Sequence, residues 1–296
     1  MFGFSSISYA ESSLPKCQGD DYKQWTNCYG EIIFPRNEYK GEWKDGKFEG
    51  KGTLTEPWGV YVGDFKNNLA DGVGHQTFKD GGWFKGEVKN DELNGKATSV
   101  WPNGDKFIGT FVNSIMQGQA TIEYADGAKY EGGMKDDFYH GKGKLIYVDG
   151  SIYVGGWKEG YIHGQGSMNY ADGSKYVGGW KEEKFHGRGT YNYPNGNKYV
   201  GLWKEDKLHG KGIFTWADGS KYKGNFKDGN EHGQGVLELH NGDKYDGQYV
   251  DGLEEGKGIY IWSIGDKYEG EWKQGTRTGK GVIIWDDGSK YEGDFL

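Results

Sequence analysis

The chain has 296 residues, of which 34% are hydrophobic and 16% aromatic, with 55 glycines and a net charge of −8. This hydrophobic share lies well below the roughly 45–50% of ordinary soluble domains, which argues against a thick two-layer core, while the many aromatic residues argue against disorder. The excess of acidic over basic residues disfavours nucleic acid as a partner and weakens attraction to anionic lipid.

The first ten residues are apolar and small, and Ser8-Tyr9-Ala10 resembles a small-x-Ala cleavage site. A complete secretory signal also needs a basic start and a longer apolar run, and both are missing here. We interpret residues 1–10 as the remnant of a signal peptide, which predicts a periplasmic or secreted protein. An ordinary terminus of a cytoplasmic protein is the alternative. No run approaches 18 apolar residues, so no transmembrane segment is predicted.

Residues 11–38 hold the only two cysteines, Cys17 and Cys28, which lie eleven residues apart. We predict that they form a disulfide in a segment that caps the rest of the chain; two free thiols are the alternative. No further metal ligands lie near them in the sequence. Gly30, Ile32 and Phe34 alternate like a strand of the region that follows.

From residue 39 onward one motif, aromatic-x-Gly-x-aromatic, recurs with a period of 23 residues. A Gly-x-Gly motif follows eleven residues after each start, with alanine in place of the second glycine at Ala97 and Ala120. Most units close with Asp-Gly or Asn-Gly. The motif starts at Tyr39, Tyr61, Phe84, Phe107, Tyr130, Tyr153, Tyr176, Tyr199, Tyr222, Tyr245, Tyr268 and Tyr291.

Each unit reads as two antiparallel strands, because its glycines and aromatic residues alternate with polar residues. The polar segments between strands are the size of turns, and Asp-Gly supplies the positive φ that short hairpin loops require. We therefore predict an all-β fold with about 24 strands. It is an elongated, twisted, single-layer antiparallel meander of 23-residue hairpins, similar to a solenoid. One face should be aromatic and the other charged.

Glycine opposite an aromatic residue lets the ring fold over bare backbone. One hairpin register with this property pairs Trp203 with Gly212 and Gly201 with Phe214, and we take it as the predicted register.

The pattern Tyr-x-Gly-x-Trp-Lys-x-Gly-x-x-His-Gly-x-Gly, intact at residues 153–166, resembles the MORN repeat. Residues 39–296 fit this resemblance as eleven full repeats and a terminal half repeat. The segment 14–30 is similar to the lead-in of bacterial MORN proteins that carry signal peptides. The resemblance implies an elongated antiparallel sheet used as a scaffold, often dimeric and sometimes associated with membranes, with no appended catalytic domain in this chain.

No catalytic, cofactor or metal site is predicted from the side chains. Five histidines recur at one position of successive repeats, about 10 Å apart, which is too far for ligands of one metal ion. We interpret them as turn residues that bond to the local backbone. Acidic pairs lie in turns without the spacing of a calcium loop, and no nucleophile has a unique base partner. The five histidines are His140, His163, His186, His209 and His232.

The predicted function is therefore that of a non-enzymatic scaffold that binds proteins, whose identity the sequence does not reveal, or itself. Its candidate interaction face is aromatic; packing of these same rings on one another as a core is the alternative. The candidate residues are Tyr153, Trp157, Tyr176, Trp180, Tyr199 and Trp203.

Two other functions stay open. A peripheral membrane module would bind phospholipid head groups through lysines, although interleaved acids such as Glu182 and Glu205 oppose this. Carbohydrate binding through exposed aromatic residues is the lesser alternative. The candidate lysines are Lys175, Lys181, Lys198, Lys204, Lys221 and Lys227.

The final residues, 291–296, form half a repeat with no hairpin partner. Unpaired strand edges favour pairing with another chain. We predict a homodimer through this edge, with Tyr291, Gly293 and Phe295 at the contact.

Overall fold

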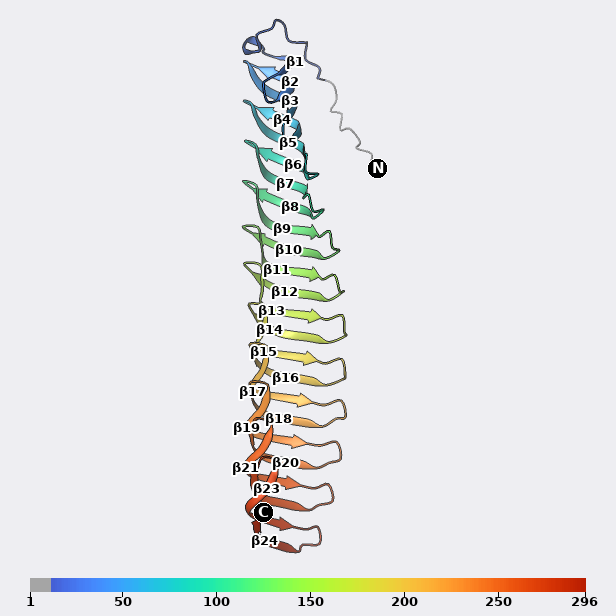
Figure 1. The fold of residues 1–296 in the computed structure, drawn as a ribbon, viewed down its shortest axis with the longest axis vertical. Helices are drawn as coiled ribbons and strands as arrows, with labels where there is room; N and C mark the ends of the chain where they lie inside the picture. Colours follow the sequence, from blue (N-terminus) through green and yellow to red (C-terminus); the bar gives the residue numbers. More distant parts are fainter. Residues whose placement is uncertain (1–11) are drawn as a thin grey trace. The chain divides into compact units, whose positions relative to one another are not determined.

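The computed structural model describes residues 12–296, and within this range the fold is all-β apart from one short 3₁₀ helix. Twenty-four strands form an antiparallel meander of hairpins that does not close, as predicted (Figure 1). The predicted signal remnant, residues 1–10, lies outside the described residues.

The chain divides into two compact units, Met1–Val148 and Asp149–Leu296. Unit 1 contains η1 (Tyr22–Gln24), β1 (Cys28–Ile33), β2 (Glu38–Lys44), β3 (Lys47–Glu56), β4 (Gly59–Lys66), β5 (Leu69–Phe78), β6 (Trp83–Lys89), β7 (Glu92–Val100), β8 (Lys106–Val112), β9 (Ile115–Glu123), β10 (Lys129–Lys135) and β11 (Phe138–Ile146). Unit 2 contains β12 (Ile152–Lys158), β13 (Tyr161–Asn169), β14 (Lys175–Lys181), β15 (Lys184–Asn192), β16 (Lys198–Lys204), β17 (Lys207–Thr215), β18 (Lys221–Lys227), β19 (Asn230–Glu238), β20 (Lys244–Val250), β21 (Leu253–Ile261), β22 (Lys267–Lys273), β23 (Thr276–Ile284) and β24 (Lys290–Phe295).

The predicted hairpin register is wrong. Gly201 pairs with Gly212, and Trp203 pairs with Leu208 rather than with Gly212. The register shifts between Gly201 and Leu202, where a β-bulge leaves two residues of β17, Gly210 and Lys211, without a partner on β16. The same shift recurs one repeat later, between Gly224 and Asn225.

The first tyrosine of the repeat stabilises this bulge. The Tyr199 hydroxyl donates a hydrogen bond of 2.9 Å to the Leu202 carbonyl at the bulge. The corresponding bond, at 2.8–3.4 Å, forms in every described repeat that begins with tyrosine. To reach this carbonyl the ring lies over backbone, and a Cβ on Gly201 or Gly212 would clash with its hydroxyl. The glycines therefore make room for a tyrosine, not for the tryptophan that we predicted.

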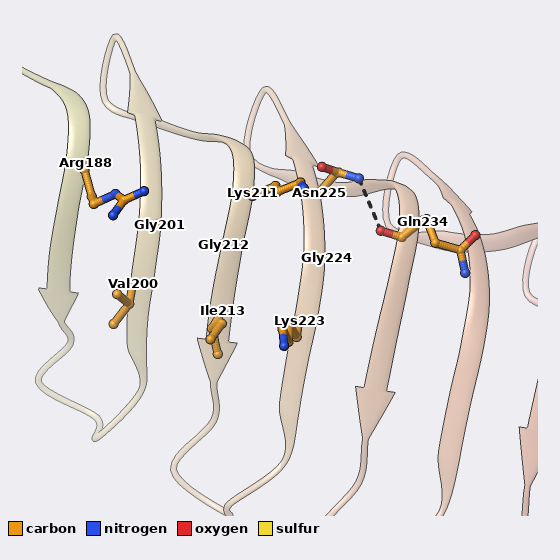
Figure 2. Close-up of a pocket in the computed structure, with 10 residues that line it drawn as sticks. All are labelled: Arg188, Val200, Gly201, Lys211, Gly212, Ile213, Lys223, Gly224, Asn225 and Gln234. Carbon is orange, nitrogen blue, oxygen red and sulfur yellow. Dashed lines mark hydrogen bonds between the residues drawn. The ribbon is translucent and has the colours of Figure 1, made fainter.

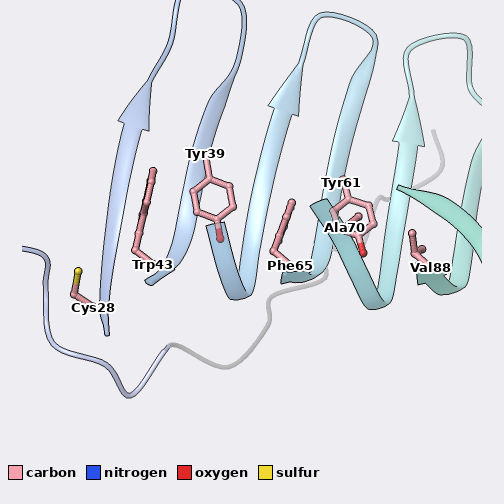
Figure 3. Packing of buried hydrophobic residues seen from close by; sticks show 7 residues of the cluster. All are labelled: Cys28, Tyr39, Trp43, Tyr61, Phe65, Ala70 and Val88. Carbon is pink, nitrogen blue, oxygen red and sulfur yellow. The ribbon is translucent and has the colours of Figure 1, made fainter. Parts of the chain in front are cut away.

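The rings form the core by packing within and between repeats. Tyr176 stacks on Phe185 with 3.8 Å between ring centroids. It also meets Trp180 of its own repeat and Trp203 of the next edge to face, at 5.1 and 5.6 Å. In unit 1, Figure 3 shows buried side chains of successive strands lining up on one side of the sheet. Each repeat therefore covers the rings of its neighbour.

Two kinds of turn join the strands. In the Asp-Gly turn after β17, Gly219 has a φ of +94°, as predicted, and its N–H donates to the Trp216 carbonyl. In the hairpin turn after β16, Glu205 and Asp206 both have positive φ without being glycine. The Asp206 carboxylate offsets this strain because it accepts a 2.7 Å hydrogen bond from the Phe185 N–H of the preceding repeat.

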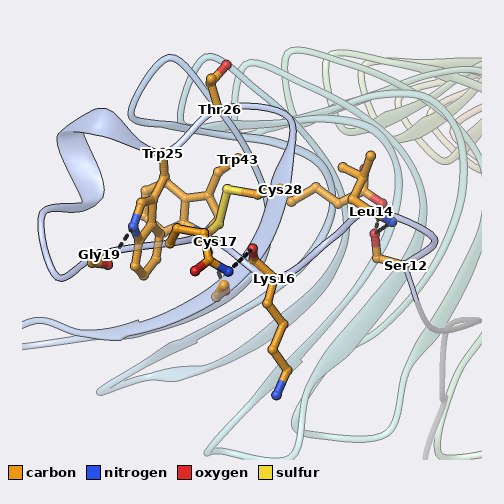
Figure 4. The surroundings of a disulfide bond; sticks show 12 residues. Ser12, Leu14, Lys16, Cys17, Gly19, Trp25, Thr26, Cys28 and Trp43 are labelled. Carbon is orange, nitrogen blue, oxygen red and sulfur yellow. Dashed lines mark hydrogen bonds between the residues drawn. A yellow bond between two sulfur atoms is a disulfide. The ribbon is translucent and has the colours of Figure 1, made fainter.

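The N-terminal segment packs against the first repeat, and its role as a cap stays a prediction. Cys17 and Cys28 form a disulfide. Strand β1 pairs with β2 through Gly30 and Gly41, in the way that the second strand of one repeat pairs with the first strand of the next. The Trp25 ring lies edge to face on Trp43 at 5.1 Å beside the disulfide, so the segment shields the end of the aromatic row (Figure 4).

Loss of the disulfide should destabilise unit 1. For a loop of this length, we expect Cys17→Ser/Cys28→Ser to lower the free energy of unfolding by about 2–3 kcal/mol. Urea unfolding followed by tryptophan fluorescence, with and without reductant, measures the change. The serine variant serves as the control because reductant should not affect it. An unfolding curve of the unaltered protein that reductant leaves unchanged would contradict the prediction.

Candidate functional site: a hollow with a glycine floor

The six predicted interaction residues are buried. Their tyrosines are 0% exposed and their tryptophans 5%. This burial favours the alternative that the sequence left open, core packing, and contact of these rings with a partner stays a prediction. The same holds for carbohydrate binding through aromatic residues.

The opposite face of the sheet carries three parallel rows of residues in unit 2. The central row is glycine, with Gly201 paired to Gly212 and Gly212 to Gly224. Cross-strand partners lie on the same face, so the residues before and after each glycine form flanking rows. One flanking row includes Val200, Ile213 and Lys223; the other includes Arg188, Lys211 and Asn225.

These rows enclose a hollow of about 550 Å³ over β15 to β19 (Figure 2). Bare glycine backbone forms its floor, since the tyrosine rings lie on the other side of the sheet. We call it the basic hollow because its charged side chains are Arg188, Lys211 and Lys223, without an acidic residue in its lining. Its lining consists of Arg188, Val200, Gly201, Lys211, Gly212, Ile213, Lys223, Gly224, Asn225 and Gln234.

A second hollow, of about 930 Å³, continues the same rows over β19 to β24 and shares Gln234 with the basic hollow. We call it the mixed hollow because Lys257, Lys280 and Lys290 stand among four acidic residues. Two of these lysines form ion pairs, Lys280 with Asp294 at 3.1 Å and Lys290 with Glu292 at 2.8 Å. Neighbouring parts of one surface therefore differ in electrostatic character.

The basic hollow belongs to a larger block of positive charge. Strands β14 to β18 contain eleven basic residues and no acidic residue, although the whole chain carries −8. Glu182 and Glu205 lie in hairpin turns and form no ion pair with these strands in the part of the chain described. The basic residues are Lys175, Lys181, Lys184, Arg188, Lys198, Lys204, Lys207, Lys211, Lys221, Lys223 and Lys227.

All six lysines predicted to face lipid belong to this block, and all six are exposed at the ends of β14, β16 and β18. The structure thus places them in two rows, with Lys175, Lys198 and Lys221 at the starts of these strands and Lys181, Lys204 and Lys227 at their ends, and none of them lines the basic hollow. Lipid binding through them stays a prediction. At the C-terminal end, β24 pairs with β23 through Gly293 and Gly281, and the predicted dimer contact of Tyr291, Gly293 and Phe295 also stays a prediction.

The histidine interpretation needs a correction. The Nδ1 atoms of His186, His209 and His232 are buried without a hydrogen bond, so the predicted bond to the local backbone does not form through them. The Nδ1 atom of His232 lies 3.7 Å from the Asp251 carboxylate. Residues 12–296 contain no cluster of three or more potential metal ligands. Nor does this range contain a helix of sufficient length and apolar character to cross a membrane.

Comparison with known families accounts for the periodicity. The family described as MORN repeat matches eleven segments, at residues 39–59, 61–83, 84–106, 107–129, 130–152, 153–175, 176–198, 199–221, 222–244, 245–267 and 268–290. This chain belongs to the MORN-repeat family. The MORN repeats span nearly the whole chain, and no catalytic domain is identified beside them. A search of curated proteins finds no match.

Solved structures with some likeness to the MORN array include TCP domains. The wild-type TCP10 domain of Danio rerio CPAP is 11% identical with a TM-score of 0.37, and the match covers 67% of this chain and 93% of that one. The same domain in complex with a STIL peptide is 17% identical with a TM-score of 0.34, covering 77% and 96%. The Drosophila melanogaster SAS-4 TCP domain, in complex with a proline-rich motif of Ana2, is 13% identical with a TM-score of 0.33, covering 60% and 90%.

The sequence predicted a charged face opposite the aromatic one, but not the hollow on it. Val200 and Ile213 look like ordinary strand residues, and only the cross-strand pairing shows that they flank one glycine row. A usable signal was present, because the absence of acidic residues from five successive strands can be read in the sequence.

Proposed function

We propose that this MORN protein is a non-enzymatic scaffold that binds a partner protein along the glycine-floored rows of unit 2. The observation that carries the proposal is the basic hollow, a concave surface among exposed side chains in a unit whose six candidate aromatic contact residues are buried in the core. Concave surfaces with apolar and convergent polar groups are the usual sites of ligand binding. Val200 and Ile213 supply the apolar surface, and Arg188 and Lys211 the polar groups.

The rigidity of the rows supports a scaffold rather than a catalyst. The floor consists of backbone that is hydrogen-bonded in the sheet, and the tyrosine hydroxyls brace it from the other face. A preformed surface of this kind loses little conformational entropy when a partner binds. The lining of the basic hollow includes no serine, threonine, cysteine, histidine, tyrosine or carboxylate side chain.

Site-specific photo-crosslinking in cells tests this function. A photoreactive amino acid at Val200, inside the basic hollow, should form protein adducts of discrete mass. The control is the same amino acid at Ile264, an exposed turn residue of unit 2 outside both hollows. Equal adducts at both positions, or none at Val200, would contradict the proposed function.

We propose further that the protein works in an oxidising compartment, either periplasmic or extracellular. The disulfide between Cys17 and Cys28 supports this location, because such bonds are rare in cytosolic proteins. Thiol labelling of the protein in intact cells should leave both cysteines unmodified until reductant is added. Free thiols in freshly isolated protein would favour a cytoplasmic location.

A further inference from the structure

The three cations of the basic hollow have no counter-ion. Arg188, Lys211 and Lys223 take part in no ion pair within residues 12–296. Their cross-strand neighbours on the same face are neutral: Leu202 for Arg188, Asn225 for Lys211, and Ile213 and Val236 for Lys223. In the adjoining mixed hollow, acidic side chains already pair two of the lysines. The basic hollow is therefore the part of this surface that attracts an anionic ligand.

The dimensions of the hollow suit an extended chain. It spans five strands, β15 to β19, and strands lie about 4.8 Å apart, so its length is about 19 Å. An extended polypeptide covers about 3.3 Å per residue, which corresponds to about six residues. Val200 and Ile213 lie across the glycine row from Arg188 and Lys211 and give such a chain apolar contacts.

We infer that the basic hollow binds an extended acidic segment of a partner protein, with apolar side chains interspersed among its carboxylates. This inference rests on the proposed function and adds the chemical class of the partner. Carboxylates of the segment meet Arg188, Lys211 and Lys223, and its apolar side chains pack on Val200 and Ile213. The acidic residues of the mixed hollow, among them Asp246 and Glu269, confine the acidic segment to the basic hollow.

An anionic membrane fits this site less well. The three cations line a hollow whose floor is backbone, and a flat bilayer surface would contact the lining side chains but not the floor between them. The mixed hollow beside it, with four acidic residues, repels the same surface. A narrow chain avoids both problems because it enters the hollow and ends before the acidic residues.

Fluorescence anisotropy with the full chain tests the inference. The probe is a labelled ten-residue peptide in which glutamate alternates with valine or serine, and its counterpart carries lysine in place of each glutamate. We expect the glutamate peptide to bind, with an affinity that falls as salt is added, and the lysine peptide not to bind. Arg188→Glu/Lys211→Glu/Lys223→Glu should weaken binding about tenfold or more.

The matched control is Lys66→Glu/Lys89→Glu/Lys135→Glu. It makes the same change in net charge at exposed strand ends of unit 1 and should leave the affinity within about twofold, because these lysines do not line the basic hollow and exposed charges outside a site are screened by salt. Circular dichroism verifies that both variants fold. No binding of the glutamate peptide, or equal losses in both variants, would overturn the inference.

Vesicles of phosphatidylserine and phosphatidylcholine in equal amounts distinguish binding of a membrane from binding of an acidic peptide. We expect excess vesicles not to displace the bound glutamate peptide. Displacement of the peptide by vesicles would show that the hollow binds lipid and would overturn the inference. The inference is also wrong if the peptide does not bind and the vesicles bind the unaltered protein but not the triple variant of the hollow. If a protein adduct forms at Val200 but the glutamate peptide does not bind, the proposed scaffold function holds and only the inference that the partner segment is acidic is wrong.

Discussion

Raising the pH above about 10 is expected to unfold the array steeply. Burial raises the pKa of Tyr39, Tyr130, Tyr176, Tyr199 and Tyr222 far above the usual value near 10. A tyrosine pKa that folding raises stabilises the protein fully below pH 10, where both states hold the proton. The stabilisation is lost as the pH rises from 10 toward the folded pKa. In this range each such tyrosine lowers the free energy of unfolding by about 1.4 kcal/mol per pH unit, and the losses from all such tyrosines in one cooperatively unfolding segment add up.

Circular dichroism recorded together with tyrosinate absorbance measures this transition. Both signals should change together, because the buried hydroxyls ionise only when the sheet opens. Tyr199→Phe is the matched control: its free energy of unfolding should depend on pH by about 1.4 kcal/mol per unit less than that of the unaltered protein between pH 10 and 12. If tyrosinate absorbance rises smoothly around pH 10 while the circular-dichroism signal of the sheet persists, the prediction that burial raises the pKa of these tyrosines is wrong.

The second large effect concerns the glycine row. Each described repeat that begins with tyrosine has glycine at the second position of Gly-x-Gly, whereas the repeats of Phe84 and Phe107 have Ala97 and Ala120 there. A Cβ on Gly212 would clash with the hydroxyl and with two ring carbons of Tyr199. Phenylalanine lacks the hydroxyl and its bond to the carbonyl, so its ring can shift, and we infer that alanine fits in those two repeats for this reason. We expect Gly212→Ala to cost about 2–3 kcal/mol, since the buried ring cannot move aside.

Removing the hydroxyl should rescue this variant. Tyr199→Phe alone should cost about 1–1.5 kcal/mol through the lost bond to the Leu202 carbonyl. The double variant should be no less stable than Gly212→Ala, which corresponds to a coupling of at least about 1 kcal/mol in urea unfolding. Tyr268→Phe combined with Gly212→Ala is the control, and its effects should add, because the two sites lie in different repeats. Additive costs at Tyr199 and Gly212 would reject the steric explanation.

Much of this fold could be derived from the sequence because strands adjacent in the chain pair with each other. The 23-residue period, the alternation of residues and the turn segments then determine the strand order and the two faces. Strand β1 could be predicted for the same reason, because Gly30 and Ile32 repeat the pattern of a second strand, and β1 pairs with β2 as that pattern predicts. The separation of Tyr199 and Trp203 from the lysines also follows from alternation alone.

The tertiary structure decided the register, the burial of the aromatic rings and the shape of the basic hollow. A bulge after Gly201 shifts the strand pairing, and it depends on the hydrogen bond from the Tyr199 hydroxyl to the Leu202 carbonyl. The alternation of residues along a strand does not reveal this bond. Burial of Trp180 and Trp203 depends on rings from the neighbouring repeat. The basic hollow likewise arises only when cross-strand pairing aligns Arg188, Lys211 and Lys223 beside one glycine row, because residues 35 positions apart meet through the sheet and not along the chain.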